Sequence, residues 1–173
     1  SIGDLAMLAC ILEARAPKAG NVQPGKEFEG TTLRHFLDAA GAISGPLDRA
    51  RESSLGDTIL EAVKESRKVT DQNVNLGIIL LLAPLASVPA GSAPRDGLRA
   101  VLEKLDSEDC RKVYEAIRLA SPGGLGNVEE ADVNSPPPPS LIAAMKLAAE
   151  RDLVARQYVN GFEQIFEEGL EIG

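Results

Sequence analysis

Residues 76–88 form the most apolar segment of the chain, and this segment limits the folds that the sequence can adopt. It is long enough for a buried helix, whereas a membrane-spanning helix needs about 20 predominantly apolar residues. It also contains Pro84. We therefore expect a helix at the centre of a helical domain rather than a membrane span.

Apolar residues recur at helical spacing in most of the remaining chain. The first helix is predicted at 2–15, with an apolar stripe at residues 2, 5, 8, 9 and 12. Further helices are predicted at 33–43, 54–69, 95–105, 107–120 and from about 139 to 170. The predicted loops are 17–30, 89–94 and 121–139. No convincing alternating strand is visible, so we predict an all-α fold: one domain, residues 1–173, built as a multi-helix bundle around a central apolar helix.

The composition favours helices and limits the partners. Aromatic residues make up 3% of the chain and Trp is absent, so Leu, Ile, Val and Ala must build the core. The net charge of −8 argues against a protein that binds the nucleic-acid backbone. A small anionic substrate held in a local basic pocket remains compatible with this charge.

The two cysteines, Cys10 and Cys110, lie far apart and form no C-x-x-C motif, which argues against a zinc site or a disulfide scaffold. No basic segment followed by an apolar one opens the chain, as a signal peptide would require. We therefore expect a cytoplasmic protein without membrane or nucleic-acid partners, for which a homodimer is one arrangement.

Two polar segments are candidate phosphate-binding sites. In the loop PKAGN, the ammonium of Lys18 lies beside Gly20 and Asn21, where the backbone can approach a phosphate closely. Local pattern alone favours an ordinary helix-terminating turn there.

The segment TDQNVNLG precedes the apolar run, with Thr70 or Asp71 as the expected N-cap and Asn73 and Asn75 in the first helical turn. A helix N-terminus attracts anions. A core helix needs only one capping residue. The two further Asn residues therefore leave two interpretations open with equal weight: a phosphate-binding site, or the capped start of a core helix.

The last predicted helix places Asp152, Arg156 and Asn160 on one side, at the end of an apolar stripe. This pattern suggests a partly covered polar patch, although Asp152 and Arg156 also have the ordinary i, i+4 spacing of a surface ion pair.

Carboxylates offer further chemistry. Glu13 ends the first helix, and Asp57, Glu61 and Glu65 repeat at i, i+4. Such a ladder is usually a solvated face, but it can also hold Mg²⁺. The single histidine, His35, is better explained as packed or exposed on its helix than as catalytic.

Several of these motifs together resemble the triphosphoribosyl-dephospho-CoA synthase family. They are Glu13, PK-x-GNV at 17–22, LGDTILEAV, T-x-x-N-x-NLGI-x-LLLAPLA and the final LIAAMKLAAERDLVARQY-x-x-GF. The chain looks closest to a divergent branch of archaeal and environmental bacterial members, in which the second loop runs into NLGI. Family members usually continue past residue 173, so the resemblance implies that the C-terminal part of the family domain is lacking.

The resemblance implies an all-α transferase that moves the triphosphoribosyl group of ATP to 3′-dephospho-CoA, or to a related acceptor, with Mg²⁺. Lys18, Gly20, Asn21, Thr70, Asn73 and Asn75 would bind phosphate. Glu13 and Glu61 would be the base or a metal ligand, in an order that the sequence leaves open. Asp152 and Arg156 are also expected to bind substrate, because they lie on the same side of the last predicted helix.

The sequence also departs from the family pattern. Ala19 stands where the family usually has proline, Asp71 replaces a glycine, and no H-K-G follows Asn75. These departures support an alternative, a non-catalytic nucleotide-binding or regulatory module of the same fold. A purely structural helical partner is a third, weaker hypothesis.

Overall fold

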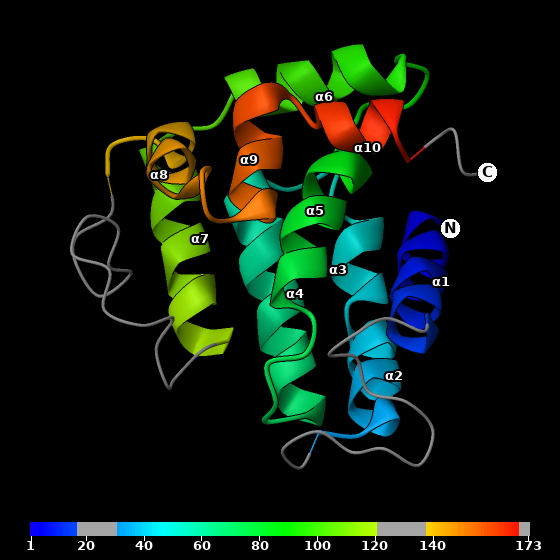
Figure 1. Ribbon diagram of the computed structural model, residues 1–173. Helices are drawn as coiled ribbons and strands as arrows, with labels where there is room; N and C mark the ends of the chain where they lie inside the picture. Colours follow the sequence, from blue (N-terminus) through cyan, green and yellow to red (C-terminus); the bar gives the residue numbers. More distant parts are fainter. Residues whose placement is uncertain (17–30, 121–137, 170–173) are drawn as a thin grey trace.

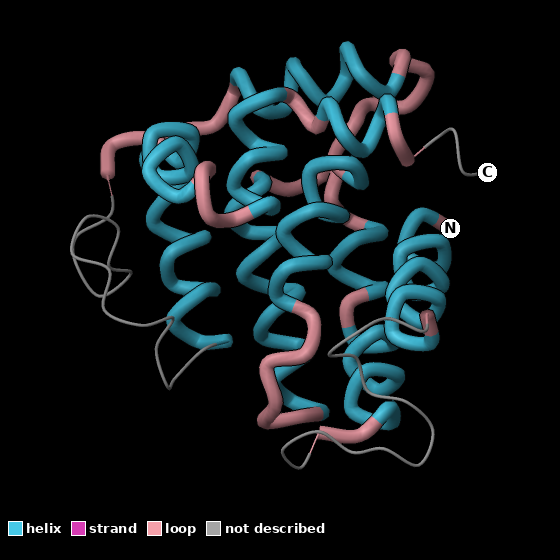
Figure 2. The backbone as a smooth tube through the Cα atoms, in the orientation of Figure 1, coloured by secondary structure: helices cyan, strands magenta, loops and turns pink. Residues whose placement is uncertain are grey.

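The computed structural model describes residues 1–16, 31–120 and 138–169. Within these ranges the regular structure is helical throughout, and no β-strand is formed (Figure 2). The prediction of an all-α fold is therefore confirmed.

The helices follow the predicted pattern up to residue 120. In chain order they are α1 (Ile2–Arg15), α2 (Leu33–Ala42), α3 (Ser44–Asp48), α4 (Leu55–Val69), α5 (Leu76–Ala86), α6 (Pro94–Glu103), α7 (Ser107–Ala120), α8 (Leu141–Ala148), α9 (Leu153–Asn160) and α10 (Glu163–Glu167).

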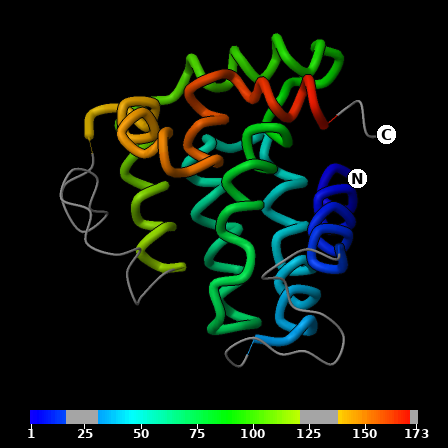
Figure 3. Tube along the Cα trace, in the orientation of Figure 1, coloured from blue at the N-terminus to red at the C-terminus, as the bar shows by residue number. Residues whose placement is uncertain are grey.

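Two helices share the centre of the bundle (Figure 1). The apolar helix α5 contacts α1, α3, α4, α6 and α9, and α4 contacts α2, α3, α5 and α7. In Figure 3 the N-terminal helices α1 and α2 lie on one side of α4 and α5, and α7 and α8 lie on the other. A central apolar helix was predicted, and α4 shares its role because its inner face is buried from Leu55 to Ser66.

The close packing of α4 on α7 depends on a glycine. The Gly56 N–H donates to the buried Asp109 carboxylate at 2.8 Å. A Cβ atom on Gly56 would lie 2.7 Å from the Asp109 Cα, so a larger residue would force the two helices apart.

The prediction of one long helix from 139 to 170 is wrong, because the chain turns twice there. Asp152 has extended backbone and its carboxylate accepts from the Val154 and Ala155 N–H groups at 2.7 and 3.0 Å, which makes it the N-cap of α9. Gly161 then ends α9 with φ 71°, and Phe162 follows with φ 63°. Phe162 is fully buried, so its burial in the core offsets an unusual backbone conformation.

Pro84 lies inside α5, and a side chain of another helix replaces the backbone hydrogen bond that this proline removes. Proline has no N–H, so the carbonyl four residues earlier, that of Leu80, loses its helical partner. The buried Tyr158 hydroxyl of α9 donates to this carbonyl at 2.7 Å. This hydrogen bond ties α9 to the centre of the bundle.

The first helix packs through its small residues. Gly3, Ala6, Cys10 and Ala14 are its buried residues. The predicted apolar stripe is turned outward instead, with Leu5, Leu8 and Leu12 exposed to 68%, 49% and 60%. Among the helices that the structure describes, none is long and apolar enough to cross a membrane.

Candidate functional site

The polar segment before α5 is a loop rather than a helical turn. Thr70 is buried and ends α4, and its N–H donates to the Ser66 carbonyl. The Thr70 hydroxyl accepts from the Gln72 N–H at 3.1 Å, which fixes a tight turn. The expectation that Thr70 or Asp71 caps α5 is therefore wrong, because this turn completes the preceding helix.

The helix α5 begins at Leu76 with Asn75 as its N-cap, and no side chain forms a capping hydrogen bond. Asn75 is 4% exposed. With its amide nitrogen oriented to donate to the Val74 carbonyl at 3.0 Å, its oxygen accepts from the Ala40 N–H at 3.3 Å. Asn75 thus joins the start of α5 to α2, and Asn73 lies before the helix rather than in its first turn.

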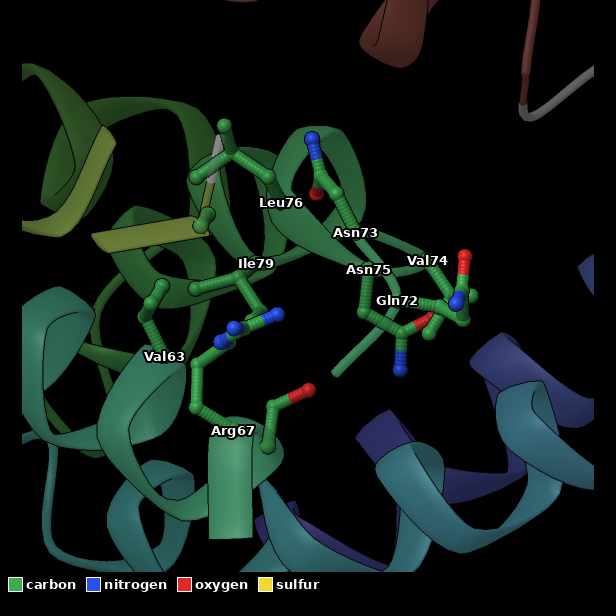
Figure 4. A pocket seen from close by; sticks show the side chains of 10 residues that line it. Val63, Arg67, Gln72, Asn73, Val74, Asn75, Leu76 and Ile79 are labelled. Atoms are coloured by element: carbon green, nitrogen blue, oxygen red, sulfur yellow. The ribbon is translucent and has the colours of Figure 1, made fainter. Parts of the chain in front are cut away.

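A small recess opens between the end of α4 and the loop that leads into α5 (Figure 4). Its polar lining consists of Ser66, Arg67, Gln72, Asn73 and Asn75, and its apolar lining of Val63, Val74, Leu76, Ile79 and Ala120. The cavity volume of about 10 Å³ has room for little more than one water molecule. A larger group would therefore lie across the recess rather than inside it.

Arg67 is the positively charged residue that lines this recess, and the sequence analysis did not select it. Arg67 is half-buried in the last turn of α4, and it donates to the Asp71 carbonyl. In Figure 4 its side chain points into the space between α4 and the start of α5. The spacing could have indicated it, because residues three apart lie on one helical face and Arg67 precedes Thr70 by three positions.

Lys18, Gly20 and Asn21 lie outside the residues that the structure describes. The structure does describe Ala16 and Thr31, the residues that flank positions 17–30. Ala16 follows α1, its N–H donating to the Glu13 carbonyl at 3.2 Å. The Thr31 hydroxyl donates to the Gln72 side-chain oxygen at 3.1 Å. Thr31, the first described residue after position 30, therefore contacts the loop before α5.

The two candidate catalytic carboxylates have different surroundings. Glu13 is half-buried in the last turn of α1, just before the lysine segment. Glu61 lies in the middle of α4 and accepts a hydrogen bond from the Arg49 guanidinium at 2.6 Å. Its Cα is roughly 13 Å from that of Thr70, because nine helical residues rise by about 1.5 Å each.

The carboxylate ladder on α4 does not fit a magnesium site. Asp57 is paired with Lys112 at 2.8 Å, Glu61 with Arg49 at 2.6 Å and Glu65 with Lys68 at 2.5 Å. The hydrogen bond from Lys112 lowers the pKa of Asp57. Across residues 1–16, 31–120 and 138–169, no group of three or more His, Cys, Asp or Glu residues could hold a metal ion.

Asp152 and Arg156 hold the corner between α8 and α9. The Asp152 carboxylate caps α9, and the Arg156 guanidinium donates to the carbonyls of Ala149 and Glu150 at 3.0 and 3.2 Å. The common helical face on which these two residues were selected does not exist, because the chain bends between α8 and α9.

A larger cavity of about 490 Å³ lies between α6 and α9. Its charged lining combines Arg95 and Arg99 with Glu103 and Glu163, so its formal charges balance. In Figure 1 this region is at the upper end of the bundle, whereas the loop before α5 is at the lower end. Thr70, Asn73 and Asn75 do not line it.

A family model described as ATP:dephospho-CoA triphosphoribosyl transferase (CitG) matches residues 1–172. The chain belongs to this family. The resemblance to triphosphoribosyl-dephospho-CoA synthases is thereby confirmed, and the protein is a transferase of the CitG type. No curated protein and no solved structure matches the chain significantly.

Proposed function

We propose that the protein transfers the triphosphoribosyl group of ATP to the 2′-hydroxyl of 3′-dephospho-CoA and releases adenine. The acceptor oxygen forms a bond to C1′ of the ATP ribose, and the bond from C1′ to adenine N9 breaks. The acceptor hydroxyl gives up one proton, and the departing adenine takes up one. The match of the family model over residues 1–172 is the observation that carries this proposal.

The triphosphate does not react in this scheme, so the protein needs to hold it while C1′ becomes electron-poor. We place it across the recess before α5. Arg67 supplies a guanidinium that can bind phosphate oxygens, and the exposed Asn73 supplies an amide. Among the described residues, no side chain caps the first N–H groups of α5, and the positive end of the helix favours an anion there.

The lysine segment completes the proposed site. Lys18, Gly20 and Asn21 lie outside the described residues and are retained as phosphate-binding residues on their sequence pattern. Thr31, the first described residue after position 30, donates to Gln72 of the recess. Thr70 and Asn75 shape the recess through their backbone contacts. Asp152 and Arg156, which hold a corner elsewhere, are not needed for binding in this proposal.

We assign the proton of the acceptor hydroxyl to Glu13 rather than to Glu61. A general base must come within hydrogen-bond reach of the proton that it removes. Glu13 lies in the last turn of α1, four residues before Pro17 in the sequence, whereas Glu61 lies in the middle of α4.

Magnesium enters this proposal with the substrate. Mg²⁺ in nucleotide sites is usually bound by the substrate phosphates together with one or two carboxylates. A dedicated cage of protein ligands is therefore not required, and none is formed by the described residues.

The proposal predicts that adenine appears in proportion to a product with the mass of triphosphoribosyl-dephospho-CoA when the protein receives ATP, Mg²⁺ and dephospho-CoA. Chromatography and mass spectrometry check this, and omission of dephospho-CoA is the control. Adenine release without dependence on dephospho-CoA would contradict the acceptor. ATP binding without any adenine release would support the non-catalytic nucleotide-binding module instead.

A further inference from the structure

The outer face of α1 is apolar without a covering element among the described residues. Leu5, Leu8 and Leu12 are exposed to 68%, 49% and 60%, and their spacing of three and four places them on one face. The same helix buries only small residues on its inner face. The usual arrangement, in which the large apolar residues face the core, is inverted.

The helix cannot rotate to bury these leucines. A Cβ atom on Gly3 would lie 2.2 Å from the Ser44 carbonyl oxygen, so α1 and α3 approach too closely for any larger residue between them. The leucine face is therefore fixed outward by the packing of the fold. Exposed apolar faces of this kind mark interaction surfaces.

Charges beside the leucine face indicate what covers it. At about 100° per residue, Asp4 and Arg15 fall on the same flank of the leucine stripe, at opposite ends of the helix. Asp4 is 68% exposed and interacts with the Ser1 ammonium at 3.0 Å. Arg15 is exposed and forms no ion pair with another described residue.

When two identical helices pair in antiparallel orientation, equal flanks meet, and each N-terminus lies beside the C-terminus of the other. A self-complementary surface must contain both members of each interacting pair. The α1 face meets this condition, because Asp4 of each copy would lie near Arg15 of the other and the helix dipoles would also be antiparallel.

We propose that a second copy of this chain docks on the leucine face of α1, forming a two-fold symmetric, antiparallel helix pair. Leu8 lies near the symmetry axis, Leu5 of each copy faces Leu12 of the other, and the ion pairs between Asp4 and Arg15 fix the register.

Sedimentation velocity over a range of protein concentrations tests the proposal. The parent chain is expected to be dimeric, and Leu8→Glu is expected to raise the dimer dissociation constant by about ten-fold or more, since it places two carboxylates near the axis. Leu147→Glu is the matched control, because Leu147 of α8 is 48% exposed. A parent chain that stays monomeric, or equal effects of the two variants, would overturn the proposal.

Further variants test the register of the helix pair. Arg15→Glu is expected to weaken the dimer, and Asp4→Arg in the same chain is expected to restore it. Leu8→Cys is expected to form an intermolecular disulfide on oxidation, whereas Leu147→Cys is not. The native Cys10 and Cys110 do not compete, because they are 3% and 0% exposed. Failure of both the charge restoration and the cross-link would exclude the antiparallel α1 pair.

Discussion

Replacement of Arg67 by Ala is expected to lower kcat/KM for ATP by roughly 10- to 150-fold. A hydrogen bond to a charged group contributes about 1.5–3 kcal/mol, and each 1.36 kcal/mol corresponds to about a ten-fold change in rate. Arg67 is the cation that lines the recess before α5 among the residues described there. Initial rates of adenine release at varied ATP concentration give the value.

The neighbouring cation supplies the control for this prediction. Lys68 is the next residue of α4, and it interacts with Glu65 at 2.5 Å rather than lining the recess. Lys68→Ala is therefore expected to leave the kinetics unchanged. Arg67 also donates to the Asp71 carbonyl, so thermal unfolding must show that Arg67→Ala is folded at the assay temperature. Parent-like kinetics of folded Arg67→Ala would remove this residue from the site.

Replacement of Tyr158 by Phe is expected to lower the free energy of unfolding by about 1–3 kcal/mol, because the substitution leaves the buried Leu80 carbonyl without its hydroxyl donor. For a chain of this length that corresponds to a decrease in Tm of roughly 2–12 °C. Chemical denaturation followed by circular dichroism measures it. Burial raises the pKa of Tyr158, so the hydroxyl is a proton donor at neutral pH.

Pro84 decides whether this explanation of the loss is correct. Pro84→Ala supplies an N–H four residues after Leu80, which is the ordinary helical donor. In the Pro84→Ala background, Tyr158→Phe is expected to lower the free energy of unfolding clearly less than it does in the parent. A double-mutant cycle gives the difference between the two decreases. An equal cost in both backgrounds would show that the hydroxyl does not compensate for the proline.

Much of the fold could be predicted because helical periodicity is a local property. The stripes over α1, α2, α4 and α7 located these helices within one or two residues of their ends. The same reasoning merged α8, α9 and α10, because all three carry compatible apolar spacing. The signals that separate them are a capping aspartate, Asp152, and a terminating glycine, Gly161, whose effect depends on the tertiary packing of Phe162.

The α1 stripe shows a different limit of pattern reasoning. Periodicity identifies an apolar face, but it does not say whether that face contacts the core. Here the close contact of Gly3 with Ser44 decides the orientation, and this contact joins residues far apart in the sequence.

The residues of the candidate site stay a prediction, but the structure corrects one of their positions. The start of the polar segment before α5 was assigned to the wrong helix, because Thr70 ends α4 and fixes a turn instead of capping α5. Arg67 was overlooked because it belongs to the preceding helix. The contact between Thr31 and Gln72 spans 41 residues, and no local pattern predicts such a contact.

A crystal structure of the protein with ATP and Mg²⁺, without acceptor, tests the central claim most directly. The account predicts that the triphosphate lies across the recess before α5, with oxygens at hydrogen-bond distance, about 2.7–3.2 Å, from the Arg67 guanidinium and the Asn73 amide. A triphosphate bound instead in the cavity between α6 and α9, beside Arg95 and Arg99, would contradict it.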